Sequence, residues 1–505
     1  MRALALLGAL AAAPLAAQPL VLSPETPASG AAFGSAVAAI NDLDGDGVRD
    51  LLVSAPGEPN GKDEPAGRVY AISGATGTRL FVIASPEAGA RFGADLDPAG
   101  DANGDGVPDF LVGAPYGSAG GEVFVFSGED QTPLLRLSSP NGEPSFGIAV
   151  ARVEDSDADG TEDVLVGTEG RGTDTPGVAY VFSGDDGSEL AAAGSPDGPA
   201  VGFAAAVDNL DDLDGDGAPE ALVGAPLVTV GEAAETGRAY AYSVSGTAAR
   251  VVTYANPADA SGARFGRAVS RIGDLDGDAV ADVIVGAVAR VYVLSGASGE
   301  LLFTLASPSP DASGSFGSAV SGAADLDDDG TPDVLVGAPQ EARVDGEDGA
   351  SGAAYVFSGA DGSLIRTIPN PAPEASAGFG TSVALAGTVD DDELPDYLIG
   401  APGGESGGRA FLIGSAPPVA SEPGASSPLA LRAWPNPSRG EVRVELPRGV
   451  GGTVVVADAL GREVARATPE ASGAARIDTR GWTPGVYVLR WTSGERDETV
   501  RLTVM

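Results

Sequence analysis

The chain has 505 residues, a formal net charge of −43, 74 glycines and 38 prolines, and it contains neither cysteine nor histidine. The missing residue types exclude disulfides, thiolate chemistry, Ser-His-Asp catalysis and histidine-ligated zinc sites. The negative charge and the 6% aromatic content argue against nucleic-acid binding, and the many glycines and prolines favour short strands joined by tight turns.

Residues 1–17 have the pattern of an export signal peptide. Arg2 precedes an apolar run from Ala3 to Ala13, and the small residues Ala16 and Ala17 suit cleavage before Gln18. The run is too short to span a bilayer, and no later stretch approaches the roughly 18 apolar residues that a spanning helix needs. We therefore expect a secreted protein with no transmembrane segment.

A Phe-Gly pair recurs along the chain, and two features follow each copy at fixed distances. An acidic loop begins nine residues after each phenylalanine, and a triplet resembling Gly-Ala-Pro begins twelve residues after the start of the loop, as in Gly113-Ala114-Pro115. The seven phenylalanines are Phe33, Phe92, Phe146, Phe203, Phe265, Phe316 and Phe379, with Ala204 in place of the glycine in the fourth copy.

Each repeat contains four short strand patterns, including an alternating run such as Glu122–Phe126 after the triplet. Repeats of this length cannot each bury a core, so stacking is required. We predict an all-β fold in which residues 18–415 form a seven-bladed β-propeller. The last repeat stops after the strand 409–413, and a spare strand precedes the first Phe-Gly at residues 20–22. The N-terminal strand is therefore expected to complete the last blade and close the ring.

The acidic loops follow the pattern Asp-x-Asp-x-Asp-Gly-x-x-Asp. Several carboxylates in one short turn repel one another, and an oxygen-only ligand set in a flexible loop favours Ca²⁺ over other cations. We expect up to about six calcium sites, in which the side chains at positions 1, 3, 5 and 9 and the backbone carbonyl at position 7 are ligands. The candidate ligands are Asp42, Asp44, Asp46, Val48 and Asp50; Asp101, Asn103, Asp105, Val107 and Asp109; Asp155, Asp157, Asp159, Thr161 and Asp163; Asp212, Asp214, Asp216, Ala218 and Glu220; Asp274, Asp276, Asp278, Val280 and Asp282; and Asp325, Asp327, Asp329, Thr331 and Asp333.

Other interpretations of these loops are weaker. An EF-hand needs a glutamate at position 12 and flanking helices, whereas position 12 is apolar here and the flanks have strand patterns. A solvated acidic turn remains the alternative, and it is the favoured interpretation for the seventh loop, where Thr388 replaces the first aspartate ahead of Asp390, Asp392 and Asp396. Paired carboxylates could also catalyse glycoside hydrolysis, but their repeated metal-binding frame makes catalysis the less favoured role.

Antiparallel strands place the acidic loops and the turns after the alternating strands on one face of the propeller. The connections on the other face vary in length, which is typical of a recognition surface on a constant scaffold. Candidate contact segments are 57–66, 116–120, 227–236 and 340–351.

The composition changes near residue 416. Residues 416–428 are rich in Pro, Ser and Ala and read as a linker, and residues 429–505 are close to neutral, whereas the preceding chain carries the excess negative charge. Alternating strands and glycine turns in 429–505 predict a small Ig-like β-sandwich. This segment contains Pro435-Asn436-Pro437, then Asp458-Ala-Leu-Gly461-Arg462, and finally Gly485-Val-Tyr487.

Two family resemblances follow from these motifs. Phe-Gly, acidic loop and Gly-Ala-Pro in fixed order resemble the FG-GAP repeats of the integrin α-subunit propeller, which implies calcium in the hairpin loops. The three motifs of the C-terminal segment are similar to the sorting domain of proteins exported by the bacterial type IX (Por) secretion system. That resemblance implies a Gram-negative-type bacterium, contact with the secretion machinery, and a secreted or cell-surface location.

The sequence therefore predicts a calcium-binding propeller that acts as an extracellular binding or adhesion module without catalytic residues. Its partner would be an extracellular protein or a glycan. An extracellular, carboxylate-based polysaccharide-active enzyme and a structural cell-surface component are the alternatives.

Overall fold

The computed structural model describes residues 19–414 apart from 25–29, 60–64, 118–119, 171–175, 199–201, 232, 245–248, 259, 310–314, 328, 342–349, 390–393 and 405. Beyond them it describes 432–434, 441–445, 453–457, 462–467, 474–480, 482–483, 485–493 and 496–504. The expected signal peptide 1–17 and linker 416–428 lie outside the described residues. The chain divides into two compact units, Met1–Pro417 and Pro418–Met505.

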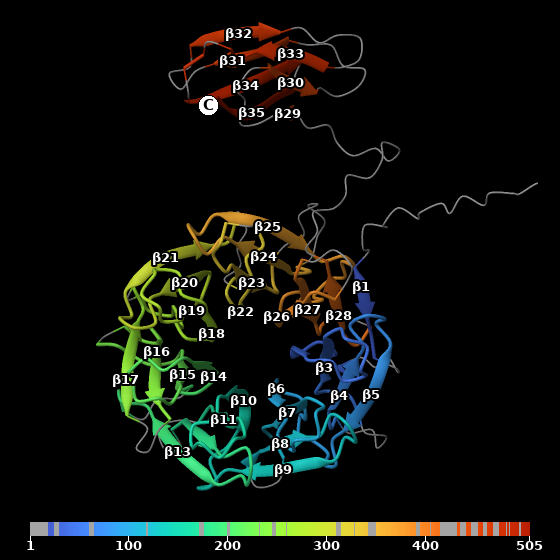
Figure 1. Cartoon of the computed structure of the whole chain (residues 1–505), viewed down its shortest axis with the longest axis vertical. Helices are drawn as coiled ribbons and strands as arrows, with labels where there is room; N and C mark the ends of the chain where they lie inside the picture. The colour runs from blue at the N-terminus through green and yellow to red at the C-terminus, as the bar shows by residue number, and fades with distance from the viewer. Residues whose placement is uncertain are drawn as a thin grey trace, which may run out of the picture. The chain divides into compact units, whose positions relative to one another are not determined.

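The first unit is a ring of seven four-stranded antiparallel sheets, which confirms the predicted seven-bladed propeller (Figure 1). In each blade the strand nearest the centre is called A, and B, C and D follow outward. The strands of blades 1–3 are, in that order, β2 (Val37–Ile40), β3 (Asp50–Ala55), β4 (Arg68–Ile72) and β5 (Arg79–Ala84); β6 (Leu96–Gly100), β7 (Asp109–Ala114), β8 (Glu122–Phe126) and β9 (Pro133–Ser138); and β10 (Phe146–Val153), β11 (Asp163–Thr168), β12 (Val178–Phe182) and β13 (Glu189–Gly194).

Blades 4–7 repeat the same order. Their strands are β14 (Ala206–Leu210), β15 (Glu220–Ala225), β16 (Arg238–Ser243) and β17 (Arg250–Ala255); β18 (Ala268–Ile272), β19 (Asp282–Ala287), β20 (Arg290–Leu294) and β21 (Leu301–Ala306); β22 (Ala319–Gly322), β23 (Val334–Ala338), β24 (Ala353–Phe357) and β25 (Leu364–Pro369); and β26 (Val383–Gly387), β27 (Asp396–Ala401), β28 (Arg409–Ile413) and β1 (Leu20–Leu22).

The last blade takes its outer strand from the start of the chain, as the sequence predicts. β1 pairs antiparallel with β28, with Leu20 opposite Leu412 and Leu22 opposite Ala410. Leu22 is buried with the closing blades, in a cluster that contains Phe33 of blade 1 and Leu398 of blade 7. Closure therefore joins both ends of the propeller in one apolar core.

The Phe-Gly and Gly-Ala-Pro motifs meet at the blade interfaces. All seven repeat phenylalanines are fully buried. A Cβ added to Gly113 of blade 2 would lie 2.2 Å from the carbonyl oxygen of Gly147 of blade 3. The same close approach joins Gly400 of blade 7 to Gly34 of blade 1, at 2.0 Å. Only glycine permits such backbone contact, so the motifs are packing devices between consecutive blades.

The second unit contains two antiparallel sheets, as expected for the small β domain. One sheet has the order β29 (Arg432–Trp434), β30 (Glu441–Glu445), β33 (Ala474–Asp478), and the other has the order β32 (Glu463–Ala467), β31 (Thr453–Ala457), β34 (Gly485–Ser493), β35 (Arg496–Val504). Val454, Val456 and Tyr487 are buried, and the Tyr487 hydroxyl donates to the carbonyl oxygen of Thr483 at 2.8 Å. Across the described residues of both units, no helix is long and apolar enough to cross a bilayer.

Candidate metal centres

Each acidic loop connects strands A and B of one blade. Positions 1 to 9 of a loop run from its first acidic residue, so in blade 1 they are residues 42–50. Strand A ends before position 1, and strand B begins at position 9, or at position 10 in blade 6, which is why the constant spacing of the sequence places every loop at the same end of its blade.

The carboxylate at position 1 accepts hydrogen bonds from the backbone of its own loop. In blade 1, Gly45 N donates to Asp42 Oδ1 at 2.6 Å and Gly47 N donates to Asp42 Oδ2 at 2.7 Å. The bond from Gly47 is the main reason that the pKa of Asp42 lies below its usual value. This carboxylate is therefore held ionised, as a metal ligand must be.

Positions 3 and 5 shape the loop in a similar way. Asp46 N donates to Asp44 Oδ1 at 3.1 Å, and Val48 N donates to Asp46 Oδ1 at 2.8 Å. These turns wrap the backbone around the acidic side chains. The loop is thus already folded around its carboxylates by its own amide groups.

The glycine at position 6 has a left-handed backbone conformation. Its φ is +88° at Gly47 and +92° at Gly330. The fifth loop has Ala279 at this position, and the alanine adopts the same conformation with φ of +70°. The loop therefore keeps its shape without the glycine, at the cost of backbone strain.

The carboxylate at position 9 is fully buried, and it ties the loop to strand B. Leu43 N donates to Asp50 Oδ2 at 2.7 Å, and Gly74 N, from the turn between strands C and D, donates to Asp50 Oδ1 at 3.0 Å. Burial raises the pKa of this group in every loop from the first to the sixth, to about 6 for Asp282 and Asp333 and to about 7 for Glu220.

Five loops bring the predicted ligands at positions 1, 3 and 9 together, with one ligand atom from each residue lying within 4.8 Å of the others. They are Asp42, Asp44 and Asp50; Asp155, Asp157 and Asp163; Asp212, Asp214 and Glu220; Asp274, Asp276 and Asp282; and Asp325, Asp327 and Asp333. In the second loop the amide of Asn103 occupies position 3 and donates to Asp105 Oδ2 at 2.7 Å. The predicted position 5 aspartates lie in the same turns but outside these groups, and the position 7 carbonyls stay predicted ligands.

The seventh loop keeps only part of this arrangement. Asp396 is buried, and its Oδ2 accepts a hydrogen bond from Val389 N at 3.1 Å, which is the position 9 contact of the other loops. Thr388 lies at position 1, and Asp390 and Asp392 lie outside the described residues. The expectation that this loop binds no metal stays a prediction.

A second element of the site, missing from our sequence analysis, is a Ser-Gly pair at the end of strand C. The glycine donates its N–H to position 9, and a Cβ on Gly74 would lie 1.9 Å from the carbonyl oxygen of Arg49, so only glycine fits. In blade 3 the serine, Ser183, also donates to Asp159 Oδ2 at 3.0 Å. The pair recurs in five blades, which was a detectable signal: Ser73-Gly74, Ser127-Gly128, Ser183-Gly184, Ser295-Gly296 and Ser358-Gly359.

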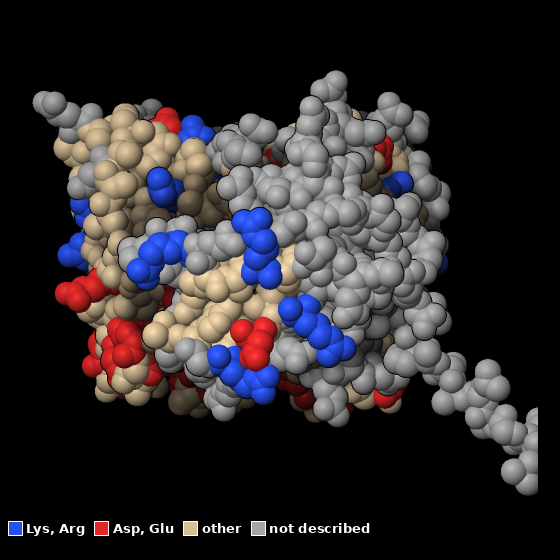
Figure 2. Space-filling view, turned by 90° about the horizontal axis from the view of Figure 1, so that it is seen from above, with Lys and Arg blue, Asp and Glu red and all other residues tan. Residues whose placement is uncertain are grey.

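The donor chemistry of these loops fits a hard divalent cation. Every side-chain ligand atom that they offer is an oxygen, and most of these oxygens belong to carboxylates, which suits Ca²⁺ or Mg²⁺. In blade 4 the buried Glu220 Oε1 has no hydrogen-bond partner among the described residues. Figure 2 shows acidic side chains gathered in groups mainly toward one edge of the visible surface, with basic ones scattered singly.

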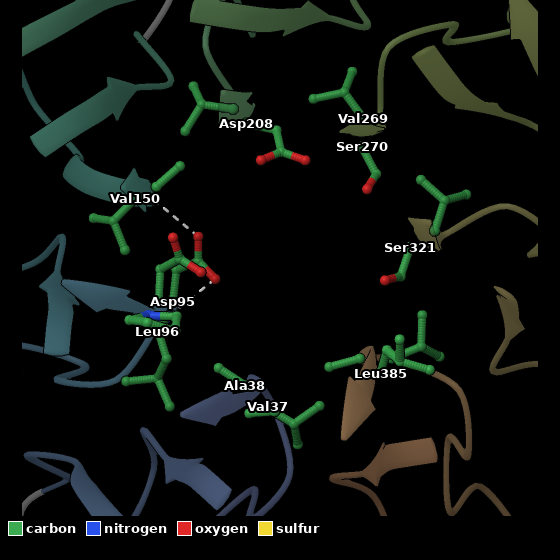
Figure 3. Close-up of a pocket in the computed structure, with 18 of the residues that line it drawn as sticks. Val37, Ala38, Asp95, Leu96, Val150, Asp208, Val269, Ser270, Ser321 and Leu385 are labelled. Atoms are coloured by element: carbon green, nitrogen blue, oxygen red, sulfur yellow. Dashed lines mark hydrogen bonds between the residues drawn. The ribbon is translucent and has the colours of Figure 1, made fainter. Parts of the chain in front are cut away.

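The central channel is a different polar site. The innermost strands line a cavity of about 350 Å³, into which Asp95, Asp208, Ser270 and Ser321 project (Figure 3). Asp95 Oδ2 accepts from Val150 N of the next blade at 2.9 Å, and Asp208 Oδ2 accepts from Arg271 N at 2.9 Å. These carboxylates thus satisfy free amide groups on the edge of the neighbouring inner strand.

Burial governs the charge of the channel carboxylates. It raises the pKa of Asp95 to about 6 and that of Asp97 to about 8, and it also raises the pKa of Asp208. Asp97 Oδ2 accepts from Arg152 N at 2.7 Å. Sequence reasoning missed this group because most repeats lack aspartate at these inner-strand positions, so the pattern does not indicate which inner-strand side chains line the channel.

Comparisons with known proteins agree with the architecture. Residues 33–72, 92–126 and 316–357 match the FG-GAP repeat, and residues 432–505 match the secretion system C-terminal sorting domain. The chain is 37% identical over 151 residues to integrin alpha-PS5 of Drosophila melanogaster and 36% identical over 154 residues to integrin alpha-IIb of Mus musculus. Each match covers 27% of this chain but only 15% of the relative, so the chain spans a small part of their length.

A solved structure titled "Crystal structure of BBS1N in complex with ARL6DN, soaked with lead" also aligns with the chain. It is 13% identical, with a TM-score of 0.49, and the alignment covers 79% of this chain and 98% of that chain. A likeness at this level carries no argument about function.

Proposed function

Because the chain carries FG-GAP repeats on a seven-bladed β-propeller and a secretion sorting domain at its C-terminal end, we propose that it is a secreted, calcium-stabilised binding or adhesion module. The sorting domain indicates export, and we assign it to a type IX-like route that delivers the protein to the cell surface or the medium. The observation that carries the calcium assignment is the gathering of three acidic ligands within 4.8 Å in five loops.

In each loop the side chains at positions 1, 3, 5 and 9 and the carbonyl at position 7 would hold the ion. The bound cation would neutralise carboxylates that otherwise repel one another and would link strand A to strand B. The chain itself orients the ligands: backbone amides of the loop donate to the position 1 carboxylate, and the amide of the glycine after strand C donates to the position 9 carboxylate. The function of the cation in this proposal is structural.

The proposed recognition surface is the opposite face, where the connections between strands B and C differ in length. In blade 1 the base of the connection 57–66 is closed by Gly67 N, which donates to the Glu58 carbonyl at 2.9 Å, while the Tyr70 hydroxyl donates to Glu58 Oε2 at 2.5 Å. Glu58 is fully buried in this arrangement.

Blade 6 uses the same device for the connection 340–351. Gly352 N donates to the Glu341 carbonyl at 3.1 Å, and the Tyr355 hydroxyl donates to the buried Glu341 side chain. Long connections with firmly anchored bases are suited to presenting contact residues from a rigid scaffold. The proposed ligand is an extracellular protein or glycan.

Arrays of glycans and of extracellular matrix proteins test this proposal. The calcium-loaded protein should bind a restricted set of ligands, and replacing 340–351 with the two-residue connection 288–289 of blade 5 should weaken that binding. A matched variant altered in the strand C to strand D turn 296–300, on the opposite face, should bind normally. If binding survives the replacement of 340–351 but is lost when 296–300 is altered, the ligand binds the face that carries the acidic loops, and the proposed recognition surface is wrong.

An enzyme is the alternative, and the channel carboxylates are the observation that favours it. Asp95, Asp97 and Asp208 share one cavity, as a carboxylate-based polysaccharide hydrolase would require. Their bonds to neighbouring backbone amides support a packing role instead. Cleavage of a bound polysaccharide that is abolished by Asp208→Asn would establish the enzyme, whereas binding without cleavage supports the adhesion module. A structural surface component would bind no ligand on either array.

A further inference from the structure

Blade 4 differs from the other blades at two positions that normally contact each other. Position 9 of its loop is Glu220, where the other six blades have aspartate, and the residue after the strand C serine Ser243 is Val244 rather than glycine. Blades 1, 2, 3, 5 and 6 all have the glycine, and it donates its N–H to position 9 at 2.9–3.2 Å in each of them.

Valine cannot take the place of that glycine. A Cβ on the glycine would lie 1.8–2.1 Å from the carbonyl oxygen of loop position 8 in all five blades, so a larger residue must move away. Val244 is instead buried in the apolar core of blades 3 and 4. The substitution therefore removes the backbone donor that completes position 9 elsewhere.

Only one of the two carboxylate oxygens of Glu220 has a hydrogen-bond partner among the described residues. Oε2 accepts a hydrogen bond from Leu213 N at 2.6 Å, whereas Oε1 is buried with no hydrogen-bond partner among the described residues. A buried polar atom that lacks a partner costs about 1–3 kcal/mol, so its retention calls for a ligand. One carboxylate oxygen of Glu220 lies within 4.8 Å of ligand oxygens of Asp212 and Asp214, so this side chain belongs to the acidic group of the loop. The neighbouring carboxylates repel Glu220, whereas a cation bound by the three carboxylates would neutralise them and could also reach the unpartnered oxygen of Glu220.

We propose that the blade 4 loop is the cation site on which the local fold depends most, because a divalent cation takes the place of the missing backbone donor at Glu220 Oε1. This inference rests on the proposed function, in which the loops bind calcium. It goes further by ranking the sites. In blades 1, 2, 3, 5 and 6 at least two backbone amides donate to the position 9 carboxylate without any metal, whereas in blade 4 only one amide does. Loss of calcium should therefore loosen blade 4 before the other blades.

Hydrogen–deuterium exchange of the full-length protein, measured by mass spectrometry with calcium and with a chelator, tests the ranking. Chelation should lower the protection of peptides over 208–225 of blade 4 and of the equivalent peptides over 38–55 of blade 1. We expect the decrease in blade 4 to be on the order of ten-fold larger than the decrease in blade 1. Val244→Gly should restore the amide donor and reduce the response of blade 4 to that of blade 1.

Glu220→Gln serves as a second variant if Val244→Gly does not fold. It removes the charge that the cation requires at position 9, so chelation should no longer affect blade 4 more than blade 1. An equal response of blades 1 and 4 in the unaltered protein would overturn the ranking while leaving calcium binding intact. No response to chelation in any loop would instead contradict the proposed calcium function.

Discussion

Replacing Leu22 by alanine tests whether the N-terminal strand closes the ring. Leu22 is 4% exposed and packs in the core shared by blades 7 and 1, whereas its neighbour Val21 is 48% exposed on the same strand. Removing a buried leucine side chain costs about 2–5 kcal/mol, because the lost apolar contacts leave a cavity. Val21→Ala should change the free energy of unfolding by less than about 0.5 kcal/mol.

These energies translate into a measurable difference in melting temperature. For about 400 residues that unfold together, the unfolding entropy is roughly 0.8 kcal/mol/K, so Leu22→Ala should lower Tm by about 2–6 °C and Val21→Ala by less than about 1 °C. Differential scanning calorimetry of the calcium-loaded protein makes the comparison. If both variants melt together at the Tm of the unaltered protein, β1 does not hold the ring closed.

Three further predictions concern the loops, the channel and the tail. Ala279→Gly should stabilise the protein by about 1 kcal/mol, because it relieves the left-handed strain at φ of +70°, and Gly47→Ala should destabilise it by a similar amount; equal melting temperatures would contradict this. Because burial raises the pKa of Asp97 to about 8, the folded state binds a proton that the unfolded chain has released, and stability should fall as the pH rises from about 4 to 8. Asp97→Asn should remove this contribution and be more stable at pH 8 by at least about 1 kcal/mol in urea titrations, whereas parallel pH profiles would show that Asp97 is solvated. A chain that ends at residue 428 should fold normally but remain in the periplasm, as fractionation and blotting can determine; its display on the surface would show that residues 429–505 are not a sorting signal.

The sequence alone was sufficient to predict the architecture and the position of the loops. Phe-Gly, acidic loop and Gly-Ala-Pro recur seven times at constant spacing, which indicates that every repeat occupies an equivalent place in the fold. The last repeat lacks its fourth strand after residue 413, and the unassigned strand 20–22 supplies it. The grouping of the acidic side chains at positions 1, 3 and 9 was also predictable, because nine consecutive residues form the whole loop and their geometry is local.

Only the tertiary structure decided which residues outside the loops complete each site. The bond from Gly74 to Asp50 crosses 24 residues and two strands, so its importance depends on how the turn after strand C folds back. The fifth loop has Ala279 where the other complete loops have glycine, yet the alanine adopts the same left-handed conformation, which the sequence does not show. The channel carboxylates Asp97 and Asp208 come from different blades and meet only because the ring closes. Local spacing thus fixes loops and repeats, whereas contacts between turns and between blades depend on packing that no single segment encodes.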